Sequence, residues 1–214
     1  DKTKQHFNSL LFREHLNNLK YDSPFLKLAL NPDLLKCISK YLGQIPRLNV
    51  IEVWYSRYLP EVKSSAMFHT DAEYNRQIKL FIYGNDVLDQ QYGPLKLLSA
   101  KNSEKVMKNT NYLSNKIIET DLLNSIVGQK DHKIITGTKG TSFLVDTSRN
   151  FHLGSKILNP EKYRITIMFQ YLPFLSFKKW FDFSHLINPK FDQIQNLVLN
   201  SKGLKKTFYK GNYY

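Results

Sequence analysis

The spacing of apolar side chains changes character near residue 47. Before that point, apolar residues recur every three or four positions, which is the period of an amphipathic helix: Leu34, Leu35, Ile38, Tyr41 and Leu42. Asn31 followed by Pro32 is a typical helix start, and Gly43 is a typical helix end. The pattern therefore predicts a helix over residues 32–42, within a helical N-terminal part that covers residues 5–43.

After residue 47, short runs of β-branched and aromatic side chains replace the helical period. These runs predict strands at residues 48–58, 77–83, 94–98, 133–136, 141–145 and 163–171. The polar residues 85–92 are expected to connect two of them. Many short strands separated by turn signals favour a mainly β fold, a barrel or jelly roll with helices packed outside.

Two stretches depart from the strand pattern. Residues 100–130 are rich in Lys, Asn and Ser, and we expect them to form a partly helical excursion from the barrel. The C-terminal extension, residues 174–214, is aromatic at first and basic towards its end. Because neither a linker nor a repeat is evident, we expect one domain over residues 1–214 with a barrel core at about residues 47–173.

Charge and cysteine content narrow the setting of the protein. The formal net charge is +13, from 31 Lys and Arg against 18 Asp and Glu, which favours anionic partners unless it serves solubility alone. The single cysteine, Cys37, cannot form an internal disulfide, so a reducing, cytoplasmic setting is expected. Its apolar neighbours predict a buried thiol. No apolar run is long enough to predict a membrane span.

A candidate metal site stands out among the polar residues. His69 and Asp71 lie two positions apart, so their side chains point to the same side of an extended segment. A barrel could bring His152 to the same point. Two imidazoles and one carboxylate form the facial triad of non-haem Fe(II) oxygenases, which leaves positions open for a chelating keto acid and O₂. The alternative is an incidental surface pair.

The other histidines lack a carboxylate at strand spacing, and none is expected to bind a metal: His6, His15, His132 and His185. Their local settings give ordinary structural interpretations. His132 lies between Asp131 and Lys133, and we expect it to be exposed.

Arg164 is the second candidate for chemistry. It lies in a strongly strand-like stretch, where it shares one face with Thr166 and Met168. A guanidinium inside a barrel is costly unless an anion meets it, and a dicarboxylate could do so through a bidentate pair. Thr166 could add a hydroxyl. The alternative is a solvated arginine or one paired with Glu161. The alternation of side chains does not fix the face of Lys79, so its approach to such a ligand is left open.

Taken in order, these residues resemble the phytanoyl-CoA dioxygenase-like branch of the Fe(II)/2-oxoglutarate-dependent oxygenases. The similarity covers about residues 30–172 and rests on the segments 31–43, 68–71, 78–83, 93–95, 140–146 and 152–154 together with Arg164. It implies a double-stranded β-helix in which His69, Asp71 and His152 bind Fe(II). Arg164, helped by Thr166, would hold the distal carboxylate of 2-oxoglutarate.

The resemblance implies hydroxylation of a small molecule, coupled to conversion of O₂ and 2-oxoglutarate into CO₂ and succinate. Asp71 favours oxygenation, because related halogenases carry a small residue there, and desaturation or ring chemistry is left open. After Gly93-Pro94-Leu95 many relatives have Pro-Gly-Ser-His, which this chain lacks. The substrate is therefore left open, with an anionic group favoured by the basic charge. Residues beside the ligands that could recognise such a group are Arg76, Lys101 and Arg149.

Two alternatives remain at this stage. A nucleic-acid-modifying oxygenase on the same scaffold would suit the positive charge. Such enzymes often carry a second arginine six residues after the first, where this chain has Gln170, so nucleic acid is not the expected partner. The other alternative is a non-catalytic β-barrel binding protein in which the triad is incidental.

Overall fold

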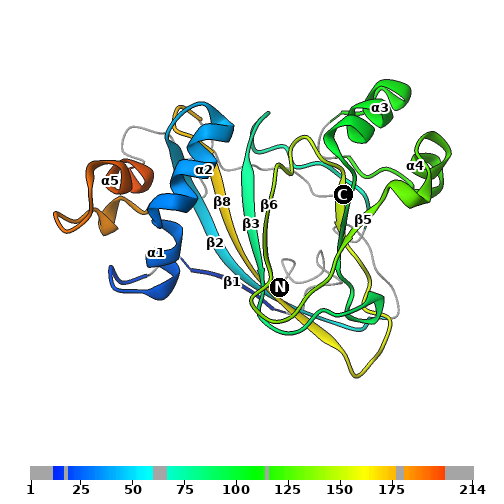
Figure 1. Ribbon diagram of the computed structural model, residues 1–214, viewed down its shortest axis with the longest axis horizontal. Helices are drawn as coiled ribbons and strands as arrows, with labels where there is room; N and C mark the ends of the chain where they lie inside the picture. The colour runs from blue at the N-terminus through cyan, green and yellow to red at the C-terminus, as the bar shows by residue number, and fades with distance from the viewer. Residues whose placement is uncertain (1–11, 17–18, 60–66, 114–115, 177–180, 201–214) are drawn as a thin grey trace, which may run out of the picture.

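The described strands form two antiparallel sheets (Figure 1). The computed structural model describes residues 12–16, 19–59, 67–113, 116–176 and 181–200. The larger sheet has the order β1 (Phe12–His15), β2 (Pro46–Arg57), β8 (Tyr163–Pro173), β3 (Ile78–Tyr83) and β6 (Ser142–Val145). The smaller sheet has the order β5 (Lys133–Ile135), β4 (Leu95–Leu97) and β7 (His152–Gly154).

The helices gather in two groups on opposite sides of the sheets (Figure 1). One group lies beside β2 and β8: α1 (Pro24–Ala29), α2 (Pro32–Leu42) and α5 (Gln193–Leu199). The other lies beyond the smaller sheet: α3 (Ala100–Thr110) and α4 (Thr120–Ile126). Short 3-10 turns occur at η2 (Gln90–Tyr92), η3 (Gln129–Asp131) and η4 (Ser184–Leu186). None of the helices in the described ranges is long and apolar enough to cross a membrane.

The alternation of side chains along β8 separates the two faces of the larger sheet. Phe169 and Tyr171 are fully buried in a cluster that includes residues of α1, α2 and α5. Met168 points to the other face and packs with Phe81 of β3 and Leu95 of β4. The inner face of the larger sheet therefore packs against the smaller sheet, and inward residues of β8 lie between the two.

The predicted elements are largely confirmed. Helix α2 has the predicted ends, because the Asn31 side chain accepts a hydrogen bond from the Leu34 N–H and Gly43 adopts a left-handed φ of +74°. All six predicted strands are present, and none of their ends is shifted by more than two residues. The expectation of a buried thiol is wrong: Cys37 is exposed, because Leu35 and Ile38 turn towards the core and leave it on the outer side of α2.

The N-terminal part is helical only in places. Residues 12–15 form β1, an edge strand paired with β2, whereas the prediction placed them in a helical region. Residues 1–11 and the basic end of the C-terminal extension, residues 201–214, lie outside the described residues. The excursion at 100–130 is partly helical, as predicted, and contains α3, α4 and part of η3.

The excursion has a hydrophobic cluster of its own. Val106 of α3 and Leu123 of α4 are fully buried against Phe68 and Phe151. These two aromatic residues directly precede His69 and His152 in the chain. The packing of the excursion therefore fixes the backbone at both histidines.

Candidate metal centre

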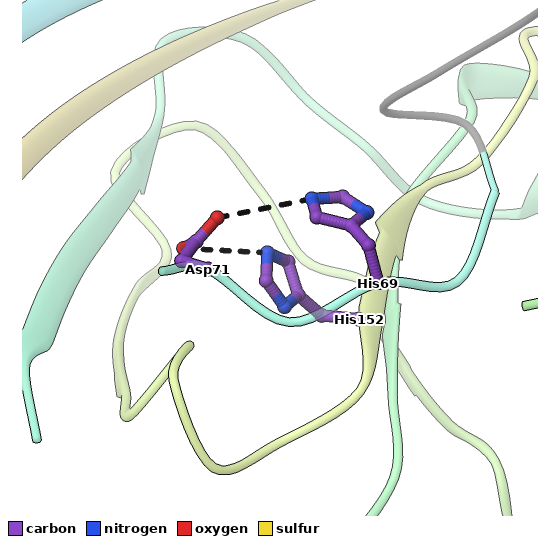
Figure 2. A group of neighbouring side chains, drawn as sticks. All are labelled: His69, Asp71 and His152. Carbon is purple, nitrogen blue, oxygen red and sulfur yellow. Dashed lines mark ion pairs between the residues drawn. The ribbon is translucent and has the colours of Figure 1, made fainter. Parts of the chain in front are cut away.

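His69 and His152 are joined directly through their backbones. They form an isolated antiparallel bridge in which the His69 N–H donates to the His152 carbonyl at 3.1 Å and the His152 N–H donates back at 3.0 Å. Directly opposed residues of such a bridge project to the same side. Their ring centroids are accordingly 4.4 Å apart, and the rings lie side by side in Figure 2.

Asp71 completes the group from the same segment as His69. Its N–H donates to the Thr147 carbonyl at 2.9 Å, which ties the segment to the loop that leads into His152. The carboxylate faces both imidazoles, with Oδ1 3.8 Å from His69 Nε2 and Oδ2 3.7 Å from His152 Nε2 (Figure 2). One ligand atom from each residue lies within 4.8 Å of the other two. Since adjacent ligands of an octahedral ion lie about 3 Å apart, a small closure would suffice to hold one cation.

Hydrogen bonds orient both imidazoles for metal binding. Nδ1 of His69 lies 2.8 Å from the Met67 carbonyl, and Nδ1 of His152 lies 3.0 Å from the Asn150 carbonyl. A carbonyl oxygen only accepts, so in the neutral rings the proton resides on Nδ1. The Nε2 lone pairs are then available on the side of Asp71. Metal-binding histidines are commonly oriented by such a second hydrogen bond.

The charges around Asp71 keep these groups in the form that binds a metal. Burial alone would raise the pKa of Asp71, but the Lys79 ammonium and the two imidazoles outweigh it and hold the pKa well below its usual range. Burial lowers the pKa of His152 to about 4. The carboxylate is therefore ionised and the His152 ring neutral near pH 7, as metal coordination requires.

Lys79 lies beside Asp71, although the sequence alone did not establish which face of the sheet its side chain occupies. It lies on β3, and its Nζ is 2.8 Å from Asp71 Oδ2, with both side chains almost buried. Burial would lower its pKa, but Asp71 and Glu73 outweigh that effect and raise it. The alternation of Ile78 and Leu80, both packed in the outer cluster, is the signal that could have placed Lys79 on the inner face.

Arg164 lies on the inner face, as predicted, and it is buried together with Thr166. Within the described residues it forms no ion pair with a carboxylate, Glu161 included. Its hydrogen-bond partner there is the Ser155 carbonyl, at 3.5 Å from Nη1. Burial lowers its pKa. A buried guanidinium with so little compensation fits an anionic ligand.

A chain of buried amides supports the loops that carry the triad. Asn49 Nδ2 donates to Gln170 Oε1 at 2.8 Å, and Gln170 Nε2 donates to Gln77 Oε1 at 2.8 Å. Gln77 Nε2 in turn donates to Thr147 Oγ1 at 3.0 Å. Thr147 is the residue whose carbonyl accepts from the Asp71 N–H. The chain thus links β2 and β8 to the backbone beside the candidate ligand.

Two tyrosines form hydrogen bonds to the segments that carry the candidate ligands. Tyr112 directly follows the C-cap of α3, and its hydroxyl accepts a hydrogen bond from the Thr70 N–H at 3.0 Å. Thr70 lies between His69 and Asp71 in the chain. The Tyr41 hydroxyl of α2 donates to Asp146 Oδ2 at 2.6 Å. Asp146 also accepts from the N–H of Ser148, so it organises the turn between β6 and His152.

The remaining predicted residues lie outside the triad. No other histidine, cysteine or carboxylate of the described ranges joins the metal-ligating group. His132 is half-buried and its ring packs edge-on against Phe68 at 5.0 Å, so the expectation of an exposed ring is wrong. Arg76, Lys101 and Arg149 are exposed.

The chain is similar in fold to several solved structures. No protein-family model matches the chain, and no curated protein matches it. Among solved structures, AviO1 from Streptomyces viridochromogenes Tue57 is similar with a TM-score of 0.52 and 13% identity, over 77% of this chain and 68% of that one. HygX from Streptomyces hygroscopicus, solved with nickel and 2-oxoglutarate bound, has a TM-score of 0.51 and 16% identity over 77% of this chain and 71% of that one. Apo HygX has a TM-score of 0.51 and 17% identity over 76% of this chain and 72% of that one.

These likenesses show that the chain shares a β-rich fold with HygX and AviO1. Identities of 13–17% carry no activity from one protein to another.

Proposed function

We propose that this protein is a non-haem Fe(II)- and 2-oxoglutarate-dependent oxygenase with a double-stranded β-helix core, similar to the phytanoyl-CoA dioxygenase-like branch. The observation that carries the proposal is the convergence of His69, Asp71 and His152, with both Nε2 atoms facing one carboxylate. Two imidazoles and one carboxylate suit Fe(II) and leave three coordination positions for other ligands. A closed structural zinc site would need a fourth protein ligand.

Arg164 supports 2-oxoglutarate as the co-substrate. It is a buried cation on the inner face, and the described residues offer it no carboxylate partner. The distal carboxylate of 2-oxoglutarate would supply that partner through a bidentate pair, and Thr166 on the same face would add a hydroxyl. The similarly folded HygX, which binds nickel and 2-oxoglutarate, is consistent with such a site in this fold.

The protein's own groups would hold and shield the reacting centre. When bound, Fe(II) and 2-oxoglutarate would supply the oxidising power, with O₂ consumed and succinate and CO₂ released. His69 and His152 would bind the metal through neutral imidazoles, and Asp71 would contribute one negative charge. The aromatic cluster of Phe68 and Phe151, covered by α3 and α4, would exclude water behind the histidines.

The substrate is proposed to be a small molecule with an anionic group. Arg76 and Arg149 are exposed on segments that adjoin the triad. The guanidinium of Arg76 lies 5.2 Å from the centre of the Tyr41 ring. Burial and Asp146 raise the pKa of the Tyr41 hydroxyl, and a hydrogen bond from Arg149 opposes this rise. Two cations near one tyrosine would attract a carboxylate or phosphate.

The test is turnover of 2-oxoglutarate by purified protein loaded with Fe(II) under air. We expect succinate release that needs both iron and 2-oxoglutarate and increases when a true substrate is added from a panel of small acids. His69→Ala should abolish release while circular dichroism shows a retained fold. Wild-type turnover in that variant, or no retained or restorable Fe(II), Mn(II) or Ni(II) in the wild type, would exclude the proposal.

A further inference from the structure

Lys79 places a full positive charge against one oxygen of the proposed iron ligand Asp71. Lys79 Nζ lies 2.8 Å from Asp71 Oδ2, and the same oxygen lies 3.7 Å from His152 Nε2. The other oxygen, Oδ1, lies 3.8 Å from His69 Nε2. The ammonium is therefore the nearest charged partner of Oδ2, and it leaves Oδ1 facing His69. An ammonium beside a metal ligand repels the cation that the ligand would bind.

The position of Lys79 is set by strands on both sides. Within β3 it pairs with Gln170 of β8 and with Val145 of β6. Because β3 is paired on both sides, the position of the Lys79 Cα is fixed, and the burial of the side chain restricts where its ammonium can lie. The other acidic groups that face it are Glu73 and Glu52, and Glu52 also accepts a hydrogen bond from Trp54 Nε1 at 2.8 Å.

We propose that Lys79 is a positioning residue that occupies Asp71 Oδ2, so that Asp71 binds the metal through Oδ1 alone and leaves room for 2-oxoglutarate to chelate. This inference rests on the proposed function. A carboxylate with both oxygens free can bind a metal ion bidentately, which would use one of the three positions left by the triad. Since 2-oxoglutarate needs two of them and O₂ the third, a bidentate Asp71 would compete with the co-substrate.

Removing the ammonium should therefore shift two affinities in opposite directions. Lys79→Met keeps an unbranched side chain of similar length and removes the charge. The metal should bind more tightly, by about tenfold, because a buried cation no longer repels it. 2-Oxoglutarate should bind the metal-loaded protein more weakly, by about tenfold, because Asp71 can close onto the metal. A purely structural role would weaken both.

Titration calorimetry with Mn(II) measures both constants without turnover: first Mn(II) into metal-free protein, then 2-oxoglutarate into the Mn(II) form. Lys108→Met is the matched control, because Lys108 forms an exposed ion pair with Glu104 at 2.8 Å, and it should change neither constant. If Lys79→Met does not fold, Lys79→Gln takes its place.

The outcomes separate this inference from the proposed function. Tighter Mn(II) binding together with weaker 2-oxoglutarate binding supports the positioning role. Parallel changes in both constants, or none, overturn that role and leave the oxygenase proposal in place. A wild-type protein that binds neither Mn(II) nor 2-oxoglutarate overturns both.

Discussion

Arg164 lies directly against Gly154, where a methyl group would crowd the guanidinium. A Cβ built on Gly154 would be 3.0 Å from Nη2 of Arg164 and 3.8 Å from its Cζ. The two residues come from β8 and β7, so this contact joins the larger sheet to the smaller one. The place of the guanidinium thus depends on a glycine at the end of the strand that begins with His152.

Replacing Arg164 by Met should separate stability from ligand binding. We expect 2-oxoglutarate to bind about 100-fold more weakly, because a charged partner of its distal carboxylate is lost. Without ligand, the free energy of unfolding should stay the same or rise, since an apolar side chain replaces a poorly compensated buried cation. Calorimetry and urea denaturation measure the two effects. A large loss of stability would show that Arg164 is structural.

Gly154→Ala should disturb the same guanidinium without removing it. The new methyl group would push Nη2 aside, and we expect 2-oxoglutarate affinity to fall roughly tenfold with little change in thermal stability. Gly128→Ala is the control, because its Cβ would meet nothing closer than 3.6 Å. Equal affinities in the two variants would contradict the proposed pairing of the co-substrate with Arg164.

Tyr41→Phe should loosen the turn that precedes His152. The hydrogen bond to Asp146 is lost, and we expect the free energy of unfolding to fall by about 1 kcal/mol because the carboxylate is buried while the tyrosine is partly exposed. Mn(II) affinity should fall severalfold through the displaced Thr147. Tyr21→Phe, which retains the ring beneath the Lys190 ammonium, should change neither quantity. Unchanged stability in Tyr41→Phe would argue against this support.

His132 predicts a pH dependence of stability in the metal-free protein. Burial, followed by the charge of Lys96, lowers the pKa of His132 below the ordinary histidine value of about 6.5. The contribution of the neutral His132 to the free energy of unfolding is therefore fully present above about pH 6.5. It is lost as the pH falls below that value, because the unfolded chain takes up a proton at this histidine more readily than the folded protein does. His132→Leu should reduce the slope of unfolding free energy between pH 6.5 and 5. Urea denaturation across this range checks it, and identical slopes would refute it.

Local signals explain what the sequence predicted well. The ends of α2 follow from a cap, a proline and a glycine that act within a few residues. The strand β8 follows from an uninterrupted β-branched and aromatic run. The convergence of His69 and Asp71 followed from their spacing, whereas the approach of His152 needed the closure of the fold.

Features that depend on sheet register could not be predicted. The approach of Lys79 to Asp71 depends on the register in which β3 pairs with β8, where Lys79 lies opposite Gln170. The amide chain from Asn49 to Gln77 joins residues that are distant in the sequence, and Asn49 lies at an irregularity in the pairing of β2 and β8. The edge strand β1 is short and precedes two helices, so its period was too brief to recognise.

The backbone bridge between His69 and His152 has a consequence for how such proteins diverge. The spacing of the two rings is fixed by a pair of hydrogen bonds and not by the chain that runs between them. Lineages can vary the exposed parts of the excursion around α3 and α4 while the ligand pair keeps its geometry, provided that Val106 and Leu123 still pack against Phe68 and Phe151. The exposed face of the excursion is therefore the part of the molecule where new selectivities can evolve at the least cost to the metal centre.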